Sequence, residues 1–361
     1  MPWPFRTGLT VHVEAPLPPD PIPTHITEEA GISAAWEDDF RVEPLVEEED
    51  RVAQGAPVLR SRRQPELVVT APMAARVATI GLGAGHRLSQ MVFFHEPDAG
   101  RHEHDIEAAR HLDDRGAVRE ALLGAGLWRS FRSRPFGQAP APDEEPSAVV
   151  VMALDTRPAA PDPRLAIADR RDDFEHGLRA LTLLTGGPIF LCQDHGSELF
   201  YAGGLDGRVR IVKCDSEHPW GLAGFQIHRH TPAKPGRPVW DIHAEDVAGL
   251  GAFLQTGLVP ETRLVSVTGP ALSEQRMVRC QPGADLRGLS YRLVRPGRHT
   301  ILTGSALDGH EARWLGPRDR QTTVIGGEMP SRGNHWFLSA LQRASRALPV
   351  IPPAAVDQAM G

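Results

Sequence analysis

An uninterrupted apolar run, Ala148–Leu154, limits the folds that are open to this chain. A run of this kind is typical of a β-strand that is covered on both faces. Downstream, Phe174–Leu184 has the spacing of a helix closed by two glycines, and Pro188–Cys192 is a second apolar run. Strand, helix and strand in this order predict an open α/β sheet, with a further strand at Arg208–Lys213. Because ligands of such sheets bind at the carboxyl ends of strands, we expect the loops after these three strands to share one functional edge.

Short β-like segments flank this α/β region. Up to residue 98 the chain twice alternates strand, turn and strand, at 46–59 and 67–80, which resembles the barrel-sandwich fold of biotinyl and lipoyl domains. Carrier domains of that fold present a lysine for modification, and this stretch has arginines instead, so we interpret it as a scaffold. Turn-separated β segments return from Gly257 to about Ser305.

The sequence therefore predicts a multidomain protein that is partly α/β and partly β-rich. We expect a barrel-sandwich-like domain over 1–98, an open α/β domain over 99–256, a small β-rich domain over 257–306 and a C-terminal tail over 307–361. One helix is predicted in the tail, at Trp336–Leu348.

Charge and composition exclude several classes of function. The formal charge of −7 argues against nucleic-acid binding and against direct binding to anionic membranes. No apolar stretch approaches the roughly 20 residues that span a bilayer, and the N-terminus has no signal-peptide pattern. We therefore expect a cytoplasmic protein that reaches a membrane only through partners. The three cysteines, Cys192, Cys214 and Cys280, are far apart in the sequence, which argues against an iron–sulfur centre or a disulfide framework.

Histidines and glycines are concentrated directly after the strand expected at Arg208–Lys213. One interpretation is a metal site, because imidazoles are common metal ligands. The other is a structural turn, which the intervening glycines and the loop position favour, so no metal site is predicted. The signature residues of this turn are His218, Pro219, Gly221, Leu222, Gly224 and His228.

Two further patterns have plainer structural explanations. Gly81–Gly85 follows a predicted strand but lacks the spacing and the helix of a dinucleotide loop, so a hairpin turn is expected. His243 lies near two carboxylates, Asp241 and Glu245, that could orient its ring. A general-base role would depend on geometry, and the structural interpretation is favoured.

The segment Gly126–Phe136 combines three arginines with three aromatic side chains. Guanidinium groups and aromatic faces suit a flat ring that carries carbonyl or methoxy oxygens. They equally suit packing or a subunit interface, where Trp and Arg are enriched. The candidates for a ring-binding surface are Trp128, Arg132, Arg134 and Phe136.

Four segments, in this order, resemble one bacterial family. They are Gly126-Leu-Trp-x-x-x-Arg-x-Arg-Pro-Phe136, then Leu154-Asp-Thr-x-Pro-x-Ala-x-Asp-Pro163, then His218-Pro-x-Gly-Leu-x-Gly-x-x-Ile-His228 with Val239-Trp-x-Ile-x-x-x-Asp-Val247, and last Thr262-Arg-Leu-Val-x-Val-Thr-Gly-Pro270 with Gly304-Ser305. The family that they resemble is the A subunit of the sodium-translocating NADH:quinone oxidoreductase. The resemblance runs from Thr7-Gly-Leu9 to about residue 351.

The resemblance implies a peripheral subunit on the cytoplasmic face of the bacterial inner membrane. Its partners would be the other five subunits of a complex that oxidises NADH, reduces ubiquinone to ubiquinol and pumps sodium ions. It also implies an α/β domain that resembles the flavin subunit of complex I and is Rossmann-like, and a β-grasp-like domain over 257–306. FAD, FMN, riboflavin and iron–sulfur centres would be on other subunits, with no cofactor and no catalytic residue on this chain. The arginine–aromatic segment would contribute to the quinone site.

The sequence departs from the family pattern at two places. Gln226 stands where the family often has a second histidine, and the family's usual cysteine-containing C-terminal segment does not follow Pro349–Pro352. Two alternatives to a pump component therefore remain: a stand-alone scaffold, or an FMN-binding paralogue that no longer joins the pump.

Overall fold

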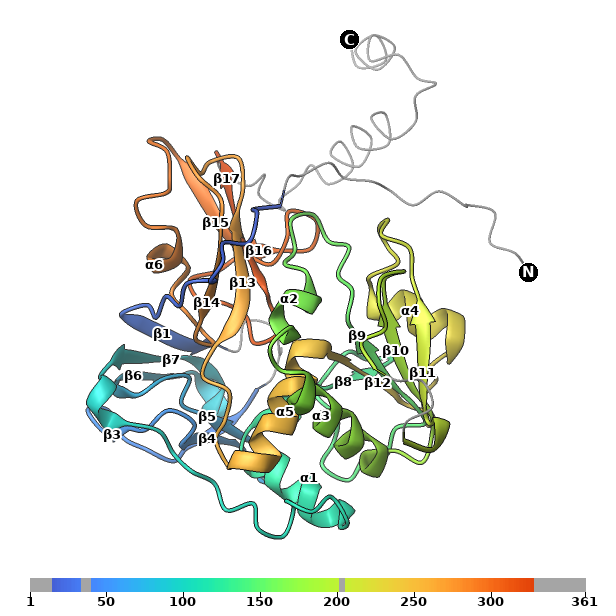
Figure 1. Cartoon of the computed structure of the whole chain (residues 1–361). Helices are drawn as coiled ribbons and strands as arrows, with labels where there is room; N and C mark the ends of the chain where they lie inside the picture. Colours follow the sequence, from blue (N-terminus) through green and yellow to red (C-terminus); the bar gives the residue numbers. More distant parts are fainter. Residues whose placement is uncertain (1–14, 34–39, 201–204, 328–361) are drawn as a thin grey trace, which may run out of the picture.

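The computed structural model describes residues 15–33, 40–200 and 205–327 (Figure 1). The helix predicted at Trp336–Leu348 and the opening segment Thr7–Leu9 lie outside the described residues. In the described part, no helix is both long and apolar enough to cross a membrane.

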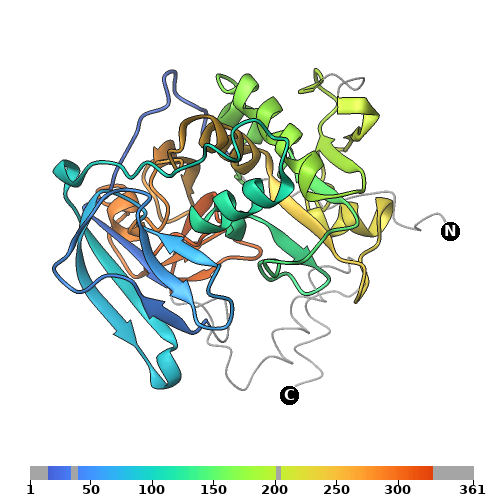
Figure 2. The same cartoon turned by 90° about the horizontal axis from the view of Figure 1, so that it is seen from below.

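Two small antiparallel sheets pack face to face in the N-terminal region (Figure 2). One sheet has the order β1 (Glu29–Ser33), β7 (Leu88–His95), β6 (Ala75–Leu82) and β3 (Arg51–Val52). The other has the order β2 (Val42–Pro44), β4 (Pro57–Ser61) and β5 (Val68–Thr70). The apolar core between them includes Val42, Leu59, Val77, Met91 and Phe93. The strand expected from residue 46 begins only at Arg51, because the charged residues before it form a turn in which the Glu47 amide donates to Asp50 Oδ2 at 2.7 Å.

A five-stranded sheet at the centre confirms the predicted open α/β region. Its order is β11 (Val209–Lys213), β10 (Ile189–Gln193), β9 (Val149–Met152), β12 (Val239–His243) and β8 (Arg132–Arg134). Strands β9 to β12 are parallel, and β8 closes one edge as an antiparallel strand. All four residues of β9 are buried, as expected for a strand that is covered on both faces.

Helices cover both faces of this sheet (Figure 1). On one face, α1 (Arg115–Gly124), α3 (Arg171–Leu184) and α5 (Ala244–Thr256) share a core with the alternate sheet residues Val149, Val151, Leu191 and Ile242. On the other face, α4 (Ala223–His230) packs over Val150, Phe190 and Cys192. The short α2 (Pro163–Ile167) precedes α3.

The third sheet continues beyond the domain boundary expected at residue 306. Its order is β14 (Arg276–Cys280), β13 (Arg263–Thr268), β17 (Gln321–Gly326), β15 (His299–Thr303) and β16 (His310–Glu311), with α6 (Leu286–Ser290) beside it. Strand β17 lies between β13 and β15 and pairs with both. The sheet is therefore continuous only with residues that the sequence analysis assigned to the C-terminal tail. The prediction failed because β17 begins with three polar residues, and only their place inside the sheet makes them buried.

The N-terminal and third regions are also joined directly. The Gly31 amide donates to the Gly283 carbonyl at 2.8 Å, and the His25 amide donates to the Arg279 carbonyl at 2.8 Å. Buried between them, Gln281 Nε2 donates to Thr27 Oγ1 at 2.6 Å. The β-rich regions from the two ends of the described chain therefore form one contiguous body beside the α/β sheet (Figure 1).

Candidate functional site

The order of the central strands creates a switch point between β9 and β12. From β9 the chain passes through α3 to β10 on one side, whereas from β11 it returns through α4 to β12 on the other. At such a point the loops at the carboxyl ends of the two neighbouring strands separate and leave a crevice, which is where ligands of open α/β sheets bind.

A cavity of about 320 Å³ lies at this switch point, and we call it the switch-point cavity. Its walls come from β8, from the ends of β9 and β12, from the start of α4 and from the third region. They include Arg132, Arg134, Asp155, Arg157, Gly221, Leu222, Gly224, Phe225, Asp241, His243, Asp246, Asp308 and Arg318. This volume is within the range of small-molecule pockets, about 300–1,000 Å³.

The loops after the three predicted strands do meet at one edge. Thr156, after β9, accepts a hydrogen bond from the Gly221 amide, after β11, at 2.9 Å. The loop after β10 joins them, because His195 Nε2 lies 3.1 Å from Asp215 Oδ1. This prediction from the strand order is therefore confirmed.

The signature turn has a steric reason for its central glycine. A Cβ atom on Gly221 would lie 2.3 Å from the Thr156 amide nitrogen, so no larger residue fits without movement of the turn. The peptide bond between His218 and Pro219 is cis. The sequence predicted a turn for the whole motif, but its second half forms the helix α4. The helix forms because the apolar Ala223 and Ile227 pack inward at helical spacing.

The other signature residues do not all lie at the cavity. Leu222 and Gly224 line the switch-point cavity with Gly221, whereas His228 is exposed on α4. Gln226, which departs from the family pattern, is buried, and its Nε2 donates to the Trp220 carbonyl at 2.6 Å. Within the described residues, no group of three or more His, Cys, Asp or Glu side chains is placed to hold a metal ion.

The four ring-binding candidates do not form one surface. Arg132 and Arg134 line the switch-point cavity, but Phe136 is 76% exposed and lies outside its walls. Trp128 is fully buried, and its Nε1 donates to the Pro140 carbonyl at 3.1 Å. Its expected contact with a ligand is therefore wrong, because the ring is needed inside the core.

Trp128 instead packs in the core next to β8, the strand that contains Arg132 and Arg134. Its ring contacts Phe131 and Trp240 edge-on, with centroid distances of 5.5 and 5.2 Å. Such aromatic contacts add to the stabilisation from burial. Two of the aromatic rings of this segment, Trp128 and Phe131, thus anchor β8 in the core, and the arginines Arg132 and Arg134 reach the cavity.

The charges around the switch-point cavity are largely paired. Arg134 Nε lies 2.7 Å from Asp241 Oδ1, and Arg157 Nη2 lies 2.6 Å from Asp155 Oδ2. Four arginines and four aspartates line the walls, namely Arg132, Arg134, Arg157, Arg318, Asp155, Asp241, Asp246 and Asp308. Arg132 Nε is buried without a hydrogen-bond partner in the part of the chain that the structure describes, and burial lowers the pKa of this guanidinium. The site therefore offers donors without a large net charge.

His243, treated as structural from the sequence, caps α5 and also borders the cavity. Its Nδ1 accepts a hydrogen bond from the Glu245 amide at 3.2 Å, so in the neutral ring Nε2 carries the proton. Burial, with the nearby charge of Arg320, lowers the pKa of His243 well below its ordinary value of 6.5. Asp246 acts in the opposite direction, and Arg157 and Arg263 lower the pKa further. His243 is therefore a neutral hydrogen-bond donor at physiological pH.

Replacing His243 with asparagine should make stability less dependent on pH below 6.5. Asparagine is a good helix cap but does not titrate. In the native protein, the unfolded chain binds a proton near pH 6.5 that the folded ring does not, so stability is lost as the pH falls through that value. We expect the slope of unfolding free energy against pH to decrease by up to about 1.4 kcal/mol per pH unit, with no change above pH 7. Urea unfolding over pH 5–8 tests this, and equal slopes would show that the folded ring titrates normally.

The fold and the site together define the class of protein. It has a doubly wound α/β sheet flanked by β-rich regions, with a charge-balanced cavity at the switch point. Residues 113–259, which contain all five strands of this sheet, match the family model described as "NqrA second alpha/beta domain".

Relatives define the particular family. The chain is 34% identical over 290 residues to the A subunit of the Na(+)-translocating NADH-quinone reductase of Rhodopirellula baltica. The aligned region covers 78% of this chain and 63% of the relative. The same component of Aliivibrio salmonicida is 34% identical over 77% of this chain and 63% of the relative. That of Marinomonas sp. is 30% identical over 83% of this chain and 68% of the relative. The chain therefore belongs to the NqrA family, which comprises the A subunits of Na(+)-translocating NADH-quinone reductases.

The match is partial in length. The chain spans 63% of each of the first two relatives. A crystal structure of NAD+-reducing [NiFe]-hydrogenase in the H2-reduced state is 11% identical, with a TM-score of 0.39 over 60% of this chain and 47% of that chain. A likeness at that score supports no conclusion about this chain.

Proposed function

We propose that this chain is a peripheral subunit of a sodium-pumping respiratory complex and that the switch-point cavity contributes to its quinone site. In this proposal the complex oxidises NADH and reduces ubiquinone to ubiquinol. The chain lies at the cytoplasmic face of the bacterial inner membrane and contacts the membrane only through the other five subunits. The names of its relatives support this assignment. We further propose that the N-terminal region is barrel-sandwich-like, that the α/β region resembles the flavin subunit of complex I, and that the third region is β-grasp-like.

One observation carries the proposal of a quinone site. The arginine strand β8 and the signature turn, more than 80 residues apart in the sequence, line the same cavity at the switch point. Because the arginines there are matched by aspartates, an anionic ligand would meet carboxylates that are already in place. A neutral ring with carbonyl oxygens needs hydrogen-bond donors in a site whose charges nearly balance, and Arg132 and His243 supply such donors.

The residues of this site would orient the ring and would not carry electrons. Arg132 would donate to one carbonyl oxygen and stabilise negative charge that develops there on reduction. Leu222 and Phe225 would cover the face of the ring. FAD, FMN, riboflavin and iron–sulfur centres would be on other subunits, so this chain alone is not expected to be active.

Crosslinking with a photoreactive ubiquinone analogue in the assembled complex tests this proposal. Peptide mapping is expected to find the label on segments 132–134 and 221–225, which line the cavity. Excess ubiquinone should prevent the labelling. Label confined to other subunits would refute the quinone site on this chain. Failure of the chain to purify with the membrane subunits would refute its place in the complex.

Replacing Arg132 with methionine is expected to raise the KM of the assembled complex for ubiquinone-1 about tenfold. Arg132 Nε has no hydrogen-bond partner among the described residues, so its removal leaves no protein group unpaired there. A hydrogen bond from a charged donor contributes about 1.5–3 kcal/mol, which is roughly tenfold or more in affinity. The matched control is Arg179→Met on the outer face of α3, where the side chain is 55% exposed. An unchanged KM in Arg132→Met would remove this residue from the site.

A further inference from the structure

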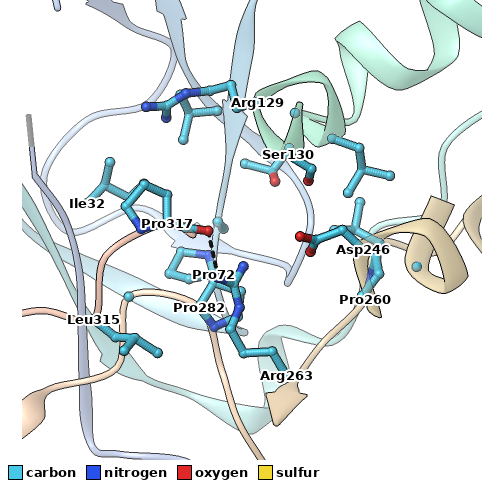
Figure 3. A pocket seen from close by; sticks show the side chains of 18 of the residues that line it. Ile32, Pro72, Arg129, Ser130, Asp246, Pro260, Arg263, Pro282, Leu315 and Pro317 are labelled. Atoms are coloured by element: carbon cyan, nitrogen blue, oxygen red, sulfur yellow. Dashed lines mark hydrogen bonds between the residues drawn. The ribbon is translucent and has the colours of Figure 1, made fainter. Parts of the chain in front are cut away.

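A second cavity lies where the three regions meet, and we call it the junction cavity (Figure 3). Its volume is about 160 Å³. The N-terminal region supplies Ile32 and Pro72, the α/β region supplies Ser130 and Asp246, and the third region supplies Pro282 and Leu315. An apolar cavity of about 150 Å³ is large enough to hold a benzene ring. The junction cavity therefore has room for a molecule of one ring.

The walls of the junction cavity are mostly apolar, but a half-buried cation, Arg263, lies among them. Figure 3 shows Arg263 reaching toward the cavity opposite Ser130, with its guanidinium beside Pro317. Arg263 Nη1 donates to the Pro317 carbonyl at 2.6 Å. Burial lowers the pKa of Arg263, because a guanidinium in this position has lost part of its water.

The carboxylates near Arg263 are already committed to other arginines. Arg320 lies 2.8 Å from Glu245 Oε2 and 2.7 Å from Asp246 Oδ1. Arg279 lies 3.6 Å from Glu245 Oε1, and the Leu264 amide donates to the same oxygen at 2.8 Å. Arg320 and Arg279 therefore take up both carboxylates, and Arg263 has no ion pair with a carboxylate among the described residues.

We propose that the junction cavity binds a small organic anion, one ring in size, whose charged group pairs with Arg263. Removing part of the water around a charge is costly unless an opposite charge or hydrogen bonds compensate it, and an anion would supply both. The planar guanidinium suits a carboxylate, which it can bind with two parallel hydrogen bonds. Proline and aliphatic side chains would enclose the apolar body of the ligand.

The two cavities differ in the property that selects a ligand. In the switch-point cavity the arginines and aspartates balance, whereas the junction cavity has an uncompensated cation. Ser130 and Asp246 line both cavities, so they form a shared wall. The proposed anion site does not depend on the proposed quinone site, and a separate experiment tests it.

Benzoate and benzamide are suitable probes, because they have nearly the same shape and differ in charge. Isothermal titration calorimetry on the full chain measures the binding of each probe. We expect benzoate to bind at one site per chain, and benzamide to bind at least about tenfold more weakly. The same experiment on Arg263→Met is expected to show a loss of benzoate affinity of at least about tenfold. Equal binding of benzoate and benzamide, or no binding of benzoate, would overturn the proposal.

A second variant separates loss of the site from loss of the fold. Ile32→Trp is expected to fill the cavity and to leave Arg263 in place, since Ile32 belongs to β1 and Arg263 to β13. Benzoate should not bind this variant, although its circular dichroism spectrum should match that of the native protein. Full benzoate binding by Ile32→Trp would place the ligand elsewhere and would refute the assignment to this cavity.

Discussion

Arg320→Met is expected to destabilise the protein by about 3–5 kcal/mol, the largest effect of a single charge removal predicted for this chain. The side chain is 3% exposed and lies 2.8 Å from Glu245 and 2.7 Å from Asp246. Both carboxylates are at the first turn of α5, and Arg320 directly precedes β17 of the third region. Its loss would leave two buried negative charges with too few partners, and it would weaken the contact between the α/β and third regions.

Denaturant unfolding followed by circular dichroism measures this change. Arg179→Met is the control, because Arg179 pairs with Glu175 at 3.9 Å on an exposed helix face, where such a pair contributes at most about 0.5 kcal/mol. Adding Glu245→Gln to Arg320→Met should restore part of the lost stability, since it removes one of the uncompensated charges. If Arg320→Met unfolds at the same denaturant concentration as the control, the ion pairs do not hold the regions together.

Gly177→Ala is expected to cost about 3 kcal/mol, at the upper end of the usual penalty for overpacking. Helices α3 and α5 cross so closely here that a Cβ atom on Gly177 would lie 2.0 Å from the Val247 carbonyl oxygen. The contact is reciprocal, because a Cβ atom on Gly251 would lie 1.9 Å from the Asp173 carbonyl oxygen. The obstructing atoms are backbone, so a methyl group can be accommodated only if the helices move apart.

The matched control is the same substitution in α1. A Cβ atom on Gly124, the last residue of α1, would have no heavy atom within 4 Å, so Gly124→Ala should leave the fold intact without loss of stability. Thermal unfolding of both variants gives the comparison. A Gly177→Ala protein as stable as the native one would mean that the two helices are further apart than in this structure.

Much of the central sheet could be predicted because its signal is local. The apolar runs at Val149–Met152 and Ile189–Gln193 are buried on both faces, and no polar alternation obscures them. Strand β12 was recognised only as part of a motif, because Asp241 interrupts its apolar pattern. In the structure Arg134 pairs with that aspartate, which makes its burial tolerable.

The site was predictable only in parts. The two arginines of β8 and the signature turn were identified separately, and nothing in the sequence shows that they meet. Their meeting depends on the crossover through α4, which places β12 beside β9. Trp128 was assigned wrongly because an aromatic residue beside arginines has the same pattern whether it faces a ligand or the core. His243 gave a weak signal as a residue between a strand and an acidic helix start, and its role at the cavity depended on the hydrogen bond to Glu245.

The position of β17 has a consequence for how the protein is made. This strand is the last described one in the chain, yet it joins the pair β13–β14 to the pair β15–β16. While the ribosome is still producing the chain, the third sheet must therefore wait as two incomplete halves with open edges. Unpaired edges of this kind are prone to aggregate, and pairings between distant segments form slowly. Synthesis that stalls before Gln321 should thus yield a chain that needs a chaperone, even though the α/β sheet has already emerged complete.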